Sequence, residues 1–134
     1  MELRFLYVGS DDTERDLASW LAMPGARLRW RFHAYQADVA AVDVGPAPLV
    51  LVADHRPAGS VLPIYAVTDL ADATQTLVAG GWTHQVGPVG TPEGPAAVLA
   101  DASGTLLALL RVDRPGAMDA AYADVSNPRA RRAP

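Results

Sequence analysis

The sequence predicts an α+β fold in which two βαβββ modules form one curved mixed sheet around a cavity, with both helices outside. Three observations support this prediction. Residues 61–112 have the pattern of a strand, a helix and three further strands, and residues 3–53 show the same order. The helix-start residues Asp12 and Asp69 give a repeat of about 57 residues. We expect one domain over 1–113, with modules at about 1–58 and 60–113.

The first module begins with a predicted strand over Leu3–Val8. A helix follows from Ser10, where Asp11 and Glu14 match a capping box. The next strand, 27–33, alternates apolar and basic residues. This alternation predicts one face with Leu28, Trp30 and Phe32, and an opposite, solvated face with Arg27, Arg29, Arg31 and His33. Two further strands are expected at 39–44 and 49–53, followed by a linker at 55–60.

The second module repeats this plan. Ile64–Thr68 is rich in β-branched and aromatic residues, which favours a strand. Thr68 or Asp69 is a suitable N-cap for the following helix, and Gly80–Gly81 ends that helix. Three short strands are predicted near 83–86, 96–100 and 105–111. Residues 114–134 are expected to form a partly disordered C-terminal tail, with a helical turn at 119–125 and disorder over 127–134.

Composition limits the possible functions. The chain has no cysteine, which excludes a disulfide framework and a thiolate metal site. Its net charge of −4 argues against nucleic acid as a partner. The N-terminal residues have no signal-peptide pattern, and no apolar run approaches the roughly 20 residues of a membrane span. We therefore expect a cytoplasmic protein that binds neither nucleic acid nor membrane.

Several short motifs occur in an order and spacing that resemble a known superfamily. They are Val67–Ala73, Ala79–Gly81, Gly87–Pro88, Thr91–Gly94 and Asp101–Leu107. Together they resemble the second module of the vicinal oxygen chelate superfamily, which includes glyoxalase I, bleomycin-resistance proteins and extradiol dioxygenases. The resemblance implies the fold stated above, a cavity for a small molecule, and paired modules within a chain or across a homodimer.

The resemblance also implies a divalent metal held by His or Glu residues on the inner strands. Carried over position by position, the ligand sites fall at Leu3, Val50, Leu62 and Ala108. None of these side chains has a metal-binding atom. If the alignment is shifted by one residue, the ligand positions fall on Arg4, Pro63, Leu107 or Leu109. None of these side chains can bind a metal cation either. We therefore predict no metal and no other cofactor.

Other reactive groups are sparse. A different metal site would need two of His33, His55 and His84 together with Asp43 or Glu93, whereas three solvated or hydrogen-bonded histidines are the simpler interpretation. Arg4, Arg29 and Arg31 are candidates to attract an anionic ligand, although a solvated strand face also accounts for them. No catalytic residue is assigned.

The aromatic residues suggest a ligand site, because small-molecule sites are mostly apolar with few polar groups. The predicted ligand-binding residues are Phe5, Tyr7, Trp30, Phe32, Leu62, Ile64, Trp82 and Ala108. The alternative for Trp20 and Trp30 is simple packing of the sheet against a helix.

Three functions remain open at this point. The first is a homodimeric binding protein for an apolar or aromatic ligand, similar to bleomycin-resistance proteins. The second is an enzyme of the same superfamily, a lyase, isomerase or dioxygenase, with a displaced metal or a metal-free acid–base site. The third is a structural or regulatory dimer whose cavity is filled by side chains.

Overall fold

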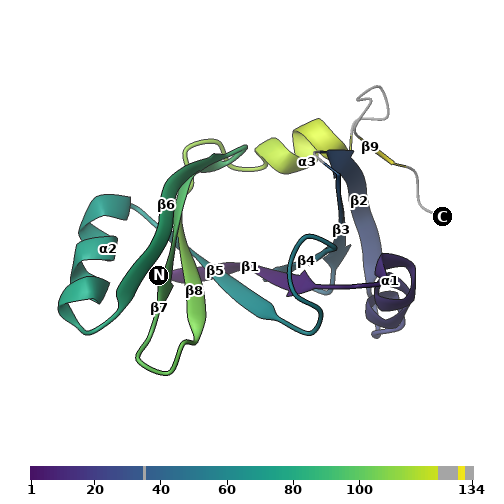
Figure 1. Cartoon of the computed structure of the whole chain (residues 1–134). Coiled ribbons are helices and arrows are strands. Elements are labelled where there is room, and N and C mark those ends of the chain that lie inside the picture. The colour runs from purple at the N-terminus through teal and green to yellow at the C-terminus, as the bar shows by residue number, and fades with distance from the viewer. Residues whose placement is uncertain (35, 124–129, 132–134) are drawn as a thin grey trace. The chain divides into compact units, whose positions relative to one another are not determined.

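The computed structural model describes residues 1–34, 36–123 and 130–131 (Figure 1). Helices and strands follow one another in the order of two βαβββ modules, so the predicted α+β class is confirmed. The elements are β1 (Glu2–Gly9), α1 (Thr13–Leu21), β2 (Arg27–Ala34), β3 (Ala37–Asp43), β4 (Leu49–Ala53), β5 (Val61–Val67), α2 (Leu70–Ala79), β6 (Thr83–Thr91), β7 (Gly94–Ala100), β8 (Leu106–Arg111), α3 (Ala117–Tyr122) and β9 (Ala130–Arg131).

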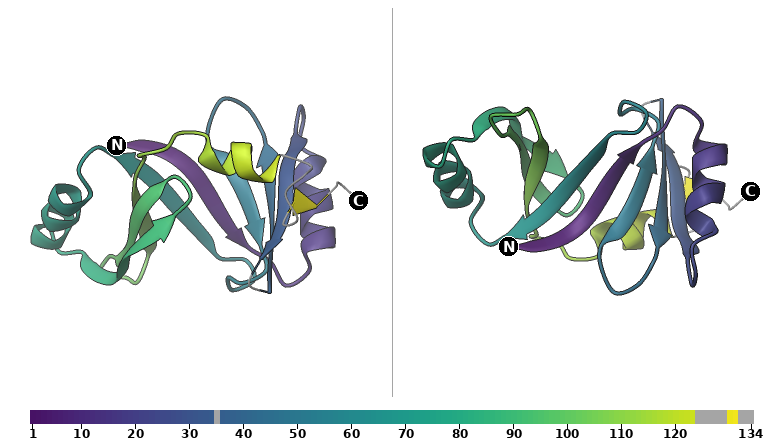
Figure 2. Two further views of the ribbon diagram at one scale, coloured as in Figure 1. Left: turned by 90° about the horizontal axis from the view of Figure 1, so that it is seen from above. Right: turned by 90° about the horizontal axis from the view of Figure 1, so that it is seen from below.

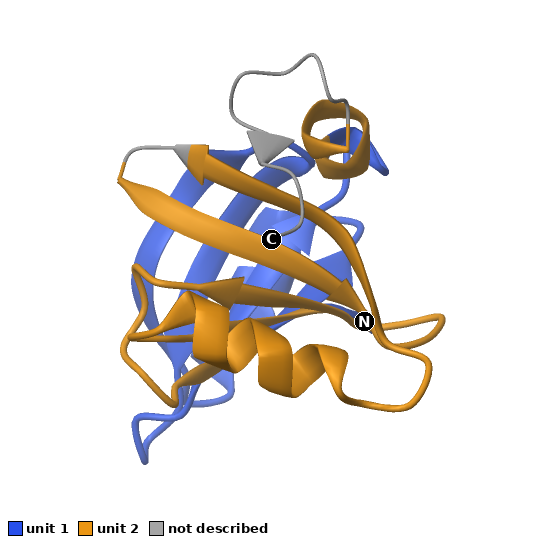
Figure 3. Cartoon of the chain, turned by 90° about the vertical axis from the view of Figure 1, so that its right-hand side faces the viewer, with its two compact units in different colours: residues 1–4, 62–117 blue, residues 5–61, 118–134 orange. Residues whose placement is uncertain are grey.

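The chain divides into two compact units whose boundaries differ from those of the two sequence modules (Figure 3). Unit 1 contains residues 1–4 and 62–117, and unit 2 contains the described residues of 5–61 and 118–134. The first residues of β1 therefore belong with the second module, and α3 belongs with the first. The prediction of a single domain over 1–113 stays a prediction.

Unit 1 is a mixed sheet with the strand order β6-β7-β8-β5, covered on one face by α2. β5 and β8 are parallel, and the other neighbours are antiparallel. The Asp69 carboxylate accepts the backbone N–H of Asp72 at 3.0 Å and caps α2, as predicted. Leu70 of α2 packs against the buried residues Ala97, Leu99, Leu107 and Leu109. These leucines define the face of the sheet that α2 covers.

Unit 2 has the strand order β1-β4-β3-β2-β9, with β1 and β4 parallel. α1 packs on one face through Leu17, which is 2% exposed (Figure 3). The strand residues beneath it are Ala40, Val42, Val50 and Val52. The capping-box prediction for Asp11 is wrong by one residue. Asp12 caps α1 by accepting the backbone N–H of Arg15 at 3.1 Å, because the helix begins at Thr13.

The predicted alternation along β2 is interrupted by a β-bulge. The register with β3 shifts between Leu28 and Trp30, so these two residues lie on opposite faces. Leu28 packs with the α1-facing cluster. Arg31, expected on a solvated face, is instead buried beneath the start of α1, where it pairs with Glu14 at 2.7 Å. Trp30 and Phe32 are therefore on the face turned away from α1.

The C-terminal segment adds elements to unit 2. α3 occupies Ala117–Tyr122, where a helical turn was expected at 119–125. Figure 2 shows α3 on the opposite side of β2 from α1. β9 pairs antiparallel with β2, with Ala130 opposite Phe32. Of the tail expected to be disordered over 127–134, residues 127–129 and 132–134 lie outside the described residues. Within the described part of the chain, no helix has the length and apolar character needed to cross a membrane.

Candidate functional site

Three aromatic rings meet on the face of unit 2 that is turned away from α1. The Tyr122 ring stacks on Phe32 with centroids 3.9 Å apart and an interplanar angle of 13°. The Trp30 ring lies 5.3 Å from Tyr122 and 5.6 Å from Phe32. We call these three residues the aromatic cluster. Trp30 Nε1 also donates to Asp119 Oδ1 at 2.7 Å, which ties α3 to β2.

The β2 bulge explains why Trp30 and Phe32 belong to this cluster. Without the bulge, Trp30 would share a face with Leu28, which packs toward α1. Tyr122 was missed by the sequence reasoning. The sequence did predict a helical turn at 119–125, and Tyr122 is an aromatic residue within that turn. This was the signal that could have identified it.

Phe5 and Tyr7 lie on the same face of unit 2. In the parallel β1–β4 pair, Phe5 is opposite Leu49 and Tyr7 is opposite Leu51. Their neighbour in β4, Val50, packs toward α1, so residues 49 and 51 point the other way. Four of the eight predicted ligand residues, Phe5, Tyr7, Trp30 and Phe32, therefore share one face.

Tyr7 has a polar partner at this face. Its Oη lies 3.0 Å from His55 Nε2, and the two rings meet edge to face with centroids 5.4 Å apart. Burial raises the pKa of Tyr7 to about 12, so the phenol is protonated at neutral pH. Burial also lowers the pKa of His55 below its usual value, which keeps its imidazole neutral. The pair therefore presents uncharged hydrogen-bonding groups, with Tyr7 on the same face of unit 2 as the aromatic cluster.

Arg56 follows His55 directly. Its Nε is buried and has no hydrogen-bond partner among the described residues. The Arg56 charge lowers the pKa of Tyr7 and the Asp54 charge raises it, and both effects are smaller than that of burial. Sequence reasoning assigned Arg56 to a linker, because nothing local indicates what a guanidinium after β4 would face.

In unit 1, Leu62, Ile64 and Ala108 lie on the face turned away from α2. Ile64 is opposite Ala108 in the β5–β8 pair, and the alternate residues Tyr65 and Leu109 pack toward α2. Leu62 and Ala108 are buried. The side chains at these three positions of the face are entirely apolar.

Trp82 does not lie on that face. It packs with Leu70 and Leu77 in the cluster beneath α2, on the other side of the sheet from Ile64 and Ala108. Its sequence position at the end of a helix, before a strand, gave no information about which face it would take. The structure therefore groups Trp82 with the packing of α2.

The residues at the superfamily's metal positions do not fit a metal ion. Val50 packs toward α1, and the β4 residue on the opposite face is Leu51. Leu51, Leu62 and Ala108 offer no ligand atom. Within the described residues, no three His, Cys, Asp or Glu side chains gather in a way that could hold a metal. The absence of a metal in the functional protein stays a prediction.

The carboxylates considered for a different metal site have arginine partners. Glu93 is buried and pairs with Arg4 Nε at 2.8 Å. Asp43 pairs with Arg27 at 3.3 Å and Arg29 at 3.0 Å. His33 and His84 are exposed. The structure does not bring these carboxylates together with the histidines.

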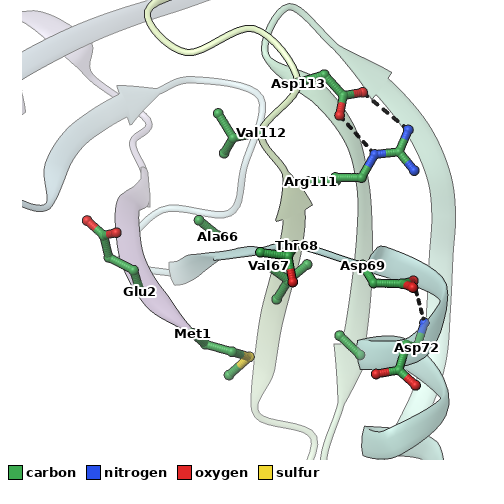
Figure 4. Close-up of a pocket in the computed structure, with 11 residues that line it drawn as sticks. Met1, Glu2, Ala66, Val67, Thr68, Asp69, Asp72, Arg111, Val112 and Asp113 are labelled. Atoms are coloured by element: carbon green, nitrogen blue, oxygen red, sulfur yellow. Dashed lines mark hydrogen bonds and ion pairs between the residues drawn. The ribbon is translucent and has the colours of Figure 1, made fainter.

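Two pockets can be described among the residues of unit 1. The larger, of about 770 Å³, lies at the start of α2 and includes Asp69 and Arg111 (Figure 4). Three of its polar side chains already have partners: Asp69 caps α2, and Arg111 Nε donates to Asp113 Oδ1 at 2.9 Å. The second pocket, of about 500 Å³, lies between α2 and the β6–β7 strands and includes His84. None of the eight predicted ligand residues lines either pocket.

Comparison with known proteins identifies the fold. No family model and no curated protein sequence matches the chain. Among solved structures, the hypothetical protein BH1468 from Bacillus halodurans C-125 matches with a TM-score of 0.70 and 12% identity, over 84% of this chain and 95% of that one. Methylmalonyl-CoA epimerase from Mycobacterium tuberculosis gives 0.63 and 14%, over 84% and 89%. A variant of the Streptomyces coelicolor epimerase, in complex with 2-nitronate-propionyl-CoA, gives 0.66 and 13%, over 84% and 95%.

These matches establish an α+β protein built from two βαβββ modules. Its fold is that of the vicinal oxygen chelate superfamily, to which the methylmalonyl-CoA epimerases belong. The resemblance inferred from the sequence motifs is confirmed at the level of the fold. At such low identity the likeness extends to the fold alone.

Proposed function

We propose that the protein binds an apolar or aromatic small molecule against the face of unit 2 that carries the aromatic cluster. The observation that supports this most strongly is the grouping of Trp30, Phe32 and Tyr122 on one face, with Phe5 and Tyr7 on the same side of the sheet. Aromatic side chains offer large apolar area at low conformational cost, which suits a ligand site.

Further support comes from the nature of the structural neighbours. One is a methylmalonyl-CoA epimerase in complex with methylmalonyl-CoA and NH4+. The fold therefore accommodates small-molecule ligands in other proteins. In unit 2, the hydrocarbon at Leu51 favours an apolar ligand and binding without the superfamily metal.

A tryptophan-resolved titration tests the proposal. The probe is 4-nitrobenzamide, a neutral aromatic that quenches tryptophan fluorescence at short range. A Trp20→Phe/Trp82→Phe variant keeps only Trp30, which is 3% exposed and lies behind the partly exposed rings of Phe32 and Tyr122. We expect saturable quenching of its emission as the probe packs on those two rings. The matched Trp30→Phe variant keeps Trp20 and Trp82, which both pack on helix-facing sides of their sheets. We expect no saturable quenching there, and equal quenching in both variants would contradict the proposed site.

The Tyr7–His55 hydrogen bond supports a second candidate function, an enzyme with a metal-free acid–base site. A protonated phenol beside a neutral imidazole is suited to proton transfer at a carbon next to a carbonyl. We expect such an enzyme to exchange the α-proton of methylmalonyl-CoA for deuterium in D2O, as followed by mass spectrometry. Tyr7→Phe should slow exchange by about 100-fold, whereas Tyr65→Phe, on the α2 side of unit 1, should not. No exchange above the buffer rate would contradict this candidate.

The other sequence-based expectations remain predictions. They are a homodimeric state, a cytoplasmic location and the absence of a cofactor.

A further inference from the structure

The short helix α3 forms one wall of the aromatic cluster, yet none of its own residues is buried. It has six residues, Ala117–Tyr122, and a helix this short is not stable in water without tertiary contacts. Trp30 of β2, by contrast, is only 3% exposed and contacts α3 through Tyr122 and Asp119. The helix therefore helps to cover a buried indole while it buries none of its own side chains.

Asp119 joins α3 to β2 through two polar contacts. Its Oδ1 accepts the Trp30 Nε1–H at 2.7 Å, and its Oδ2 accepts a hydrogen bond from Arg29 Nη1 at 3.4 Å. The Asp119 side chain is 44% exposed, so water competes for both contacts. Because both hydrogen bonds depend on one side chain of α3, a single substitution removes them together.

The apolar contact of α3 covers a ring that a ligand would use. Tyr122 stacks on Phe32 with ring centroids 3.9 Å apart and an interplanar angle of 13°. A flat aromatic ligand would stack on Phe32 in the same way. Both rings are partly exposed, so a ligand can make a first contact with them while α3 is in place. Contact with the face of Phe32 that Tyr122 covers requires that Tyr122 move away.

The chain just before α3 contains a residue suited to a hinge. Gly116 has a φ of +74°, a conformation that glycine adopts without steric cost. A Cβ built at this glycine would meet no other atom within 4 Å, so its surroundings do not hold the backbone in place. Glycine hinges of this kind often precede segments that close over a ligand site.

We propose that α3 is a lid over the aromatic cluster, latched by Asp119, whose opening admits a ligand to the face of Phe32 that Tyr122 covers. Opening this helix leaves the core of unit 2 intact, because α1 packs its buried residues on the other side of β2 (Figure 2). The inference rests on the proposed function, and it adds a step that controls entry to the aromatic site.

Acrylamide quenching of Trp30 tests the lid without any ligand, in the Trp20→Phe/Trp82→Phe background. Asp119→Ala removes both hydrogen bonds to β2, and we expect the quenching constant to rise by about threefold or more. Asp119→Asn keeps an acceptor for the indole N–H and should give a smaller rise. Asp11→Ala is the matched control, because it also removes an aspartate that pairs with an arginine of unit 2. It should leave the quenching constant unchanged.

Stopped-flow mixing with 4-nitrobenzamide tests entry of a ligand. In the background that keeps only Trp30, we expect a fast quenching phase from first contact and a slower phase. The rate of the slower phase should saturate with probe concentration, because opening of α3 limits entry. Asp119→Ala should speed this phase by about fivefold or more, and Asp11→Ala should keep both phases.

The outcomes separate the lid from the ligand site. An unchanged acrylamide quenching constant in Asp119→Ala would overturn the lid, whatever the probe does. A raised constant without saturable quenching by 4-nitrobenzamide would support the lid and overturn the proposed site. If Asp119→Ala loses its cooperative urea transition, Asp119→Asn decides: a rise above the parent supports the lid, and no rise overturns it.

Discussion

Replacing Asp38 by leucine is expected to lower the free energy of unfolding by about 3 kcal/mol, because the substitution removes the main counter-ion of a buried guanidinium. The Arg31 side chain is 2% exposed, and it meets Asp38 through two hydrogen bonds, Nε to Oδ1 at 3.0 Å and Nη2 to Oδ2 at 2.6 Å. Glu14 and Thr13 also contact Arg31, which joins the start of α1 to the β2–β3 hairpin.

A double substitution separates two contributions to the loss of stability: the cost of leaving the Arg31 charge without Asp38, and the net stabilisation that the ion pair itself provides. Arg31→Met combined with Asp38→Leu should recover most of the lost stability, because no buried charge is then left alone. Asp11→Ala, which breaks the exposed pair with Arg15, is the control and should cost under about 0.5 kcal/mol. Urea denaturation measures all three variants. A double variant as unstable as Asp38→Leu alone would show that the loss is due to packing.

The second large effect is a loss of stability at high pH that depends on Tyr7. Burial raises the pKa of this phenol from 10.0 to about 12 in the folded protein. Between these values the folded state holds a proton that the unfolded state has released. Stability therefore falls as pH rises from about 10 to about 12, and Tyr7 contributes about 2 kcal/mol to this loss.

The Tyr7 contribution is measured as a difference between variants. Denaturant unfolding of the wild type and of Tyr7→Phe should give stability curves that converge as the pH rises through this range, because phenylalanine has no proton to release. Tyr65→Phe, in unit 1, should keep the wild-type slope. Parallel curves for the wild type and Tyr7→Phe would contradict a buried, protonated phenol.

Local sequence signals predicted much of the fold. The Asp69 cap and the glycines at 80 and 81 fixed the ends of α2, and the apolar run Leu49–Ala53 matches β4 residue for residue. These signals act within a few residues, so no knowledge of distant contacts is needed. The same applies to Leu17, whose helical spacing correctly identified the buried face of α1.

The site was less predictable because its geometry depends on partners far along the chain. The β2 bulge turns Trp30 away from Leu28, and its position is set by pairing with β3. Tyr122 meets Phe32 from the C-terminal segment, and His55 meets Tyr7 from beyond β4. Residue types and spacing identify none of these contacts, because each contact joins segments that are far apart in the sequence. Local signals report only on the conformation of neighbouring residues.

The two compact units do not coincide with the two halves of the sequence repeat, which has a consequence for dividing the chain. A gene half ending near residue 60 encodes one complete βαβββ repeat, yet it lacks the Asp119 carboxylate that binds Trp30. The complementary half lacks Arg4, the partner of Glu93. Each half thus depends on a short segment encoded by the other. A chain divided near residue 60 would therefore leave Trp30 in one half and Glu93 in the other without these partners.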